Sequence, residues 1–154
     1  MLLGKKIEKI LKNKTGQDAI IEIDNLLTKI FYENPSKLSL PEKNIVYIEE
    51  LEHEINNGGF NQYFSNSSGD NSNETLEALK IIKSKVFYDI LKNAIDKFPN
   101  GVVPKDRGER ENIVTKIDKE VELWNYLDNE FYKYEEDIYK LMVEYIKNNI
   151  KDFR

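Results

Sequence analysis

The 154-residue chain contains no cysteine and only one histidine, His53. Without cysteine it can form neither a disulfide nor a thiolate zinc site, and it has no thiol nucleophile. The segment Glu50–His53 has a Glu-x-x-His spacing, but a di-iron carboxylate site needs two such pairs, and a zinc hydrolase helix needs two histidines. We therefore expect no metal site.

Long apolar runs are also missing. The longest, residues 45–48, is far shorter than the ~18 residues of a membrane-spanning helix. The first residues include no apolar segment of signal-peptide length. Aromatic residues make up 11% of the chain and charged residues 33%, and both fractions are ordinary for a folded domain. A disordered chain would have fewer aromatic residues. The sequence favours one cytoplasmic domain spanning residues 1–154, without membrane association.

Arginine is scarce, since of 23 basic residues only Arg107, Arg110 and Arg154 are arginines. Arginine is the preferred residue for bidentate recognition of phosphate and guanine, so we expect no direct binding to nucleic acid. The net charge of the whole chain is a modest −5. The position of the acidic residues is more informative than their total.

Acidic side chains gather in two stretches. Residues 41–60 contain five acidic and one basic side chain, and residues 118–137 contain eight and two. Such clustering suits long-range attraction of a basic partner, although two solvated helix faces would give the same pattern. Tyr126 and Tyr134 lie off the apolar spacing and are candidate aromatic anchors. We predict an acidic interaction face made of Glu49, Glu50, Glu52, Glu54, Asp118, Glu122, Asp128 and Glu130.

Apolar residues recur at helical spacing along the whole chain, and no segment alternates long enough to predict a strand. The spacing predicts helices over residues 3–11, 20–31, 41–57, 71–82, 87–98, 113–131 and 138–146. The polar stretches 65–73 and 101–108 are predicted to be exposed loops. We therefore expect an all-α fold, a single compact domain of six or seven helices.

The segment Asn57–Asn66 reads NGGFNQYFSN and differs from its surroundings. Its adjacent glycines lie between two helical patterns and predict an αα-corner. We expect Gly58 to take the left-handed conformation that ends a helix. We expect Gly59, which has no Cβ, to let the next helix turn back close to the first.

The side chains after the glycines divide between two helical faces. The polar face carries two amides four residues apart, those of Gln62 and Asn66. The opposite face is aromatic and is predicted to be buried; it comprises Phe60, Tyr63 and Phe64. Two interpretations stay open: a structural corner with an aromatic plug, and a polar recognition site. In an alternative function the two amides and Arg110 line a pocket for a substrate or small ligand.

The ten residues Asn57–Asn66 resemble the DNA-mimic-protein-like bacterial family, whose hallmark is NGGF-x-QYF-x-N. The resemblance extends over about residues 42–153 and leaves residues 1–40 outside. It implies an all-α fold without a cofactor. It also implies an acidic surface that occupies a DNA-binding protein.

These observations favour a non-enzymatic protein-binding module whose partner is basic, a DNA-binding protein or a toxin. If residues 118–137 were one helix they would span about 30 Å, a length over which duplex DNA carries roughly 18 negative charges. The stretch offers eight acidic and two basic residues, so we expect at most a weak DNA mimic. A homodimer, which would add charge, is left open.

Overall fold

The computed structural model describes residues 2–154, and all regular secondary structure among these residues is helical. The predicted all-α fold is confirmed. The described residues form eight α-helices, whereas six or seven were expected. They separate into two compact units: unit 1 comprises the residues up to Glu49 together with Asp137–Arg154, and unit 2 comprises Glu50–Glu136.

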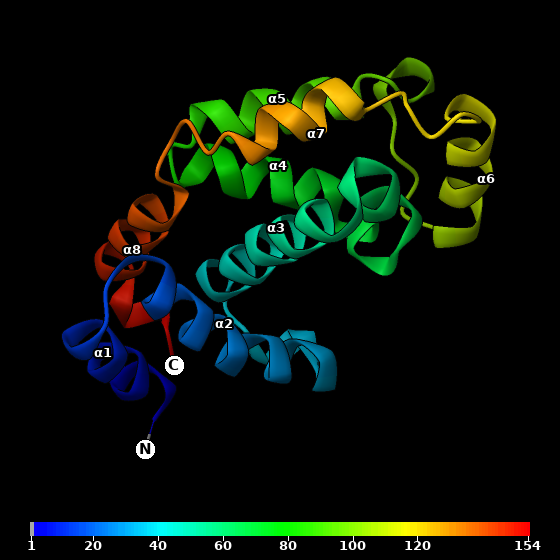
Figure 1. Ribbon diagram of the computed structural model, residues 1–154. Helices are drawn as coiled ribbons and strands as arrows, with labels where there is room; N and C mark the ends of the chain where they lie inside the picture. Colours follow the sequence, from blue (N-terminus) through cyan, green and yellow to red (C-terminus); the bar gives the residue numbers. More distant parts are fainter. Residues whose placement is uncertain (1) are drawn as a thin grey trace. The chain divides into compact units, whose positions relative to one another are not determined.

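Unit 1 contains α1 (Leu3–Asn13), α2 (Gly16–Glu33), the first part of α3 (Leu40–Ser65) and α8 (Ile138–Asn148). Helix α2 packs against both α8 and α1 (Figure 1). The helices bury the apolar stripes that the sequence spacing predicted, such as Ile20, Ile23 and Leu27 on α2. The backbone N–H of Arg154 donates to Glu42 Oε1 at 2.7 Å, which fixes the C-terminal end to the first turn of α3.

Unit 2 contains the rest of α3 with α4 (Ser72–Ile81), α5 (Lys85–Ile95), α6 (Arg107–Ile117) and α7 (Asn125–Tyr132). Helix α5 packs against both α4 and α7 (Figure 1). Three short 3-10 helices connect α-helices: η1 (Pro35–Lys37), η2 (Ser67–Asn71) and η3 (Pro99–Gly101). A fourth, η4 (Ile150–Asp152), follows α8. No helix among the described residues is both long enough and apolar enough to cross a membrane.

The core of unit 2 is aromatic. The predicted buried face of the hallmark is confirmed, because Phe60, Tyr63 and Phe64 have no exposed surface. The Phe64 ring lies 4.8 Å from that of Phe98 and 5.1 Å from that of Trp124, measured between ring centroids. Such edge and offset contacts stabilise a core beyond the area they bury.

The helix predicted over residues 113–131 is in fact two helices, because α6 ends at Ile117 and α7 begins at Asn125. Two local features interrupt it. Asp118 Oδ1 accepts hydrogen bonds from the backbone N–H groups of Glu122 and Leu123, both at 2.9 Å, which competes with helical pairing. Val121 has a φ of +55° and is 60% exposed. It is therefore not a core residue, although it continues the apolar spacing of the sequence.

The stretch 65–73, predicted as an exposed loop, is largely helical and partly buried. It forms η2, where Ser68 and Gly69 are both buried. Two of its serines bond inside the chain: the Ser68 hydroxyl donates to the Tyr63 carbonyl at 3.2 Å, and the Ser72 hydroxyl donates to the Gly69 carbonyl at 2.7 Å. Hydrogen bonds from short hydroxyl side chains therefore stabilise a compact turn here, although the composition of the stretch is typical of a flexible loop.

Candidate functional site

The hallmark segment kinks α3 at Gly59. This residue has a φ of +72° and a ψ of −172°, which a residue with a side chain rarely adopts. The prediction placed the positive φ one residue earlier, at Gly58, and that prediction is wrong. The helix continues through Gly58, where a Cβ would meet the side chain of Gln62 one turn later.

The kink is fastened to α7 through Asp128. The backbone N–H of Phe60 donates to Asp128 Oδ1 at 2.8 Å, and a Cβ on Gly59 would overlap the same carboxylate. Burial raises the pKa of Asp128, the Phe60 hydrogen bond lowers it, and the charge of Asp118 raises it further. The second glycine of the hallmark is thus needed because the Asp128 carboxylate occupies the space beside it.

The residue after Phe60 reaches the connection between α6 and α7. The Asn61 side-chain amide donates to Asp118 Oδ2 at 2.7 Å. The other oxygen of Asp118 accepts from the backbone of Glu122 and Leu123, so one buried carboxylate bonds both to the hallmark and to the connecting segment. Two residues of the hallmark therefore position the chain from Asp118 to Asp128.

The two amides of the polar face share one acceptor. Gln62 and Asn66 donate through their side-chain nitrogens to the same oxygen, Glu54 Oε2, at 2.8 and 3.0 Å. Glu54 lies on the α3 segment before the kink, so these bonds tie the two parts of α3 together. The prediction that these amides lie on a common face is consistent with this geometry.

Arg110 of α6 is fully buried. Its guanidinium donates to the carbonyls of Phe64 at 2.6 Å and Asn66 at 2.8 Å, and pairs with Asp70 at 2.6 Å. It also donates to the carbonyls of Pro104 and Lys105, at 2.9 and 3.0 Å. Gly69 leaves the room for this side chain, because a Cβ there would lie 2.7 Å from Arg110 Nε. The arginine thus holds together the end of α3, η2 and the start of α6.

Most of the acidic residues predicted to form a surface are wholly or partly buried. Glu49, Glu52 and Asp118 are buried, and only Glu122 of the eight is exposed. The other four are half-buried, and several have partners, as in the Glu130–Lys133 ion pair at 2.6 Å. The physical reason is that these carboxylates accept hydrogen bonds from the fold itself. Exposed Glu120, which spacing did not single out, lies beside Glu122 in the connecting segment.

The exposed part of this region lies in residues 119–126, which we call the exposed segment; within it only Trp124 is buried. It presents two carboxylates, Glu120 and Glu122, next to apolar surface. Tyr126 is 72% exposed, Val121 60% and Leu123 36%. A hollow of about 330 Å³ lies against Tyr126 and Leu123; its lining residues are Asn93, Asp96, Lys97, Leu123, Tyr126 and Leu127. The second tyrosine candidate, Tyr134, instead donates to Glu52 Oε2 at 2.9 Å.

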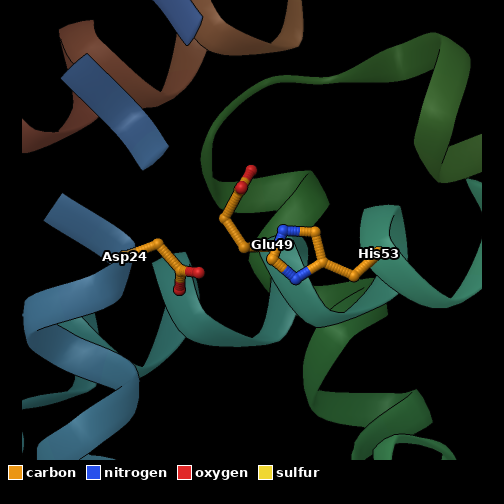
Figure 2. Close-up of side chains that lie close together, drawn as sticks. All are labelled: Asp24, Glu49 and His53. Carbon is orange, nitrogen blue, oxygen red and sulfur yellow. The ribbon is translucent and has the colours of Figure 1, made fainter. Parts of the chain in front are cut away.

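Among the described residues, three side chains that could bind a metal ion lie close together: Asp24, Glu49 and His53. Asp24 and Glu49 are both buried in unit 1, and their carboxylate oxygens lie within 4.8 Å of one another (Figure 2). His53 is exposed and lies one turn after Glu49 on α3. The sequence shows this spacing of four residues, but no metal site was expected because the chain has only one histidine. Asp24 accepts a hydrogen bond from Thr28 at 2.8 Å, and all three side chains have interactions within the chain.

The fold and this geometry define an all-helical module whose NGGF segment organises a buried polar network and an adjoining exposed segment. The chain belongs to the DMP19-like protein family, whose family model matches residues 36–149. The match includes the hallmark, Arg110 and the exposed segment, and it leaves α1 and α2 outside. No curated protein and no solved structure gives a significant match to the chain.

Proposed function

We propose that this protein is a non-enzymatic binding module that engages a basic protein through the exposed segment. The observation that carries the proposal is the combination of Glu120 and Glu122 with the exposed side chains of Val121, Leu123 and Tyr126. An exposed tyrosine beside apolar groups and a hollow is typical of an interface anchor. Carboxylates at the rim of such an anchor attract a basic partner and select it by charge.

The hallmark would then act as a scaffold for this surface. Asn61 bonds to Asp118 and the Phe60 backbone bonds to Asp128, so the two ends of the exposed segment are fixed to the kink at Gly59. A loop fixed in this way loses little conformational entropy when it binds, which strengthens association. This role explains why the hallmark needs a glycine at position 59 although the segment itself is largely internal.

Family membership supports a DNA-binding protein as the partner. Charge alone does not supply the whole affinity in this proposal. Only two carboxylates of the exposed segment point to solvent, against one exposed lysine, Lys119. The module would therefore imitate DNA only in part and would rely on Tyr126 and its apolar neighbours for the remaining binding energy.

A pocket enzyme built on the hallmark has less support. Gln62 and Asn66 already donate to Glu54, and the Arg110 guanidinium donates to four carbonyls and one carboxylate. Groups engaged in this way would have to exchange internal bonds for a ligand. Their geometry favours the structural role over the small-ligand alternative.

Affinity capture from the native cell tests the proposal. The tagged wild-type protein is compared with E120K/E122K and with the control E77K/E109K, which makes the same change of charge at exposed positions of α4 and α6. We expect a basic protein to be captured by the wild type and by the control and to be lost with E120K/E122K. Equal capture by all three would refute a role for the exposed segment.

A further inference from the structure

A second surface of opposite charge lies in unit 1. Helices α1 and α2 leave a groove of about 350 Å³ between them, lined by Lys6, Lys9, Ile10, Asn13, Lys14, Glu22 and Leu26. Ile10 and Leu26 form its apolar floor, and lysines stand along its edge. All of these residues precede residue 36, where the family match begins, so the groove is an addition to the family module.

The positive charge here is concentrated. Residues 1–14 contain five lysines and one glutamate in a chain whose net charge is −5. All five lysines are exposed. Lys14 is paired with Glu22 at 2.6 Å across the groove, whereas Lys6 and Lys9 follow one another at helical spacing along α1. Between Lys6 and Asn13 the helix rises about 10 Å, which is two turns.

We propose that this groove binds an acidic amphipathic helix of a protein partner. An apolar side chain of that helix enters the hollow over Ile10 and Leu26. Carboxylates one turn apart on its flank face Lys6 and Lys9. This is the helix-in-groove mode of recognition, in which residues at i and i+3 or i+4 supply both the anchor and the charges.

Other anionic occupants fit the groove less well. A membrane surface would need apolar side chains that project outward, but Ile10 is only 7% exposed and lies at the bottom of a hollow. Nucleic acid would leave the apolar floor uncovered, and the groove offers no arginine and no aromatic side chain on which a base could stack. A helix with separate acidic and apolar faces satisfies both parts of the groove.

A titration of the ¹⁵N-labelled full-length protein tests the inference. The probe is a synthetic 14-residue helical peptide with leucines on one face and glutamates beside them. A scrambled peptide of the same composition is the control ligand, and a 14-bp DNA duplex is the alternative ligand. K6Q/K9Q removes two cations of the groove; K29Q/K37Q removes two exposed lysines elsewhere in unit 1.

We expect the amphipathic peptide to shift the amide signals of residues 6–14 and 22–26. Its affinity should fall at least tenfold in K6Q/K9Q and should not change in K29Q/K37Q, and the scrambled peptide should bind at least tenfold more weakly. Equal binding of the two peptides, shifts elsewhere, or preferential binding of the duplex would overturn the inference. So would salt-sensitive self-association that K6Q/K9Q abolishes, because the occupant would then be a second copy. E120K/E122K should bind the peptide like the wild type, because its changes lie outside the groove. Loss of the proposed function in that variant would therefore leave peptide binding intact, and the two proposals can fail independently.

Discussion

Two residues that are distant in sequence, Gly59 and Asp128, compete for one small volume. The positive φ of Gly59 produces the kink in α3. The missing Cβ leaves room for the Asp128 carboxylate, which accepts a hydrogen bond from the Phe60 N–H. The chain offers a matched comparison at Gly16, which has a similar φ of +53° but no atom within 4 Å of the position that a Cβ would take. Gly16 therefore shows the effect of a positive φ where no steric overlap is added.

We predict that Gly59→Ala lowers the free energy of unfolding by clearly more than Gly16→Ala. A positive φ should cost about 1–2 kcal/mol at Gly16 and at least as much at Gly59, whose φ and ψ lie in a region that is almost restricted to glycine. At Gly59 the methyl group also displaces Asp128 from the Phe60 N–H, which adds about 1–3 kcal/mol. Denaturant melts of both variants measure the difference. Equal losses would mean that Asp128 moves aside at no cost.

The charge of Asp128 is predicted to oppose folding. Burial raises its pKa above 3.8, so between that value and the folded pKa the folded state binds more protons than the unfolded state. The free energy of unfolding should therefore fall as pH rises through this window. Asp128→Asn keeps an acceptor for Phe60 and removes the titration, so the stability of the wild type relative to this variant should decline from about pH 3 upward.

Urea melts of both proteins from pH 3 to 6 give this difference directly, since the other carboxylates are common to both. Asp128→Ala provides the control for the hydrogen bond. It leaves the Phe60 N–H without its acceptor and should cost about 1–3 kcal/mol at neutral pH. A wild type that gains stability over Asp128→Asn as pH rises would show that the hydrogen bond outweighs burial.

At the scale of elements, three segments meet around the Arg110 side chain: the end of α3, η2 and the start of α6. A planar guanidinium with five donors suits this position, because its bonds go to four carbonyls and one carboxylate in different directions. The polar stretch 65–73 is ordered for this reason, although its composition is typical of a loop.

We predict that Arg110→Lys destabilises the fold by about 3 kcal/mol or more, because an ammonium cannot reach all of these acceptors and buried carbonyls lose their donors. The melting temperature should drop by roughly 6–12 °C. Arg107→Lys, three residues earlier and exposed, should cost under about 1 kcal/mol. Thermal melts of the two variants compare them. Similar small losses would indicate that water replaces the lost bonds.

The sequence was most informative where contacts are local. The apolar spacing predicted the helices of unit 1 and the buried face of Phe60, Tyr63 and Phe64. It missed the break between α6 and α7 because Val121 continues the apolar period by coincidence, while the cause of the break is a carboxylate, Asp118, bonding to the backbone that follows it.

The burial of acidic residues was beyond the reach of sequence patterns. Glu52 meets Tyr134 across 82 residues, and Asp118 meets Asn61 across 57. No periodicity records such a pairing. The sequence therefore shows where acidic residues cluster, but which of their carboxylates reach solvent depends on tertiary partners.

At the scale of the whole chain, charge is separated along the sequence. Residues 1–14 are strongly basic, and exposed acidic residues flank the apolar side chains of residues 119–126. The two surfaces belong to different compact units and are proposed to serve different partners. Such separation gives a modest net charge to a chain that is weakly basic in unit 1 and acidic in unit 2.

In the proposed function, the exposed segment attracts a basic protein by charge and holds it by its apolar side chains. The most direct measurement is the association rate of the captured partner with wild type, E120Q/E122Q and Y126S at several salt concentrations. We predict that the association rate of the wild type falls with salt, that E120Q/E122Q slows association and flattens this dependence, and that Y126S mainly speeds dissociation. Rates that are the same for all three proteins at every salt concentration would refute the proposed role of the exposed segment.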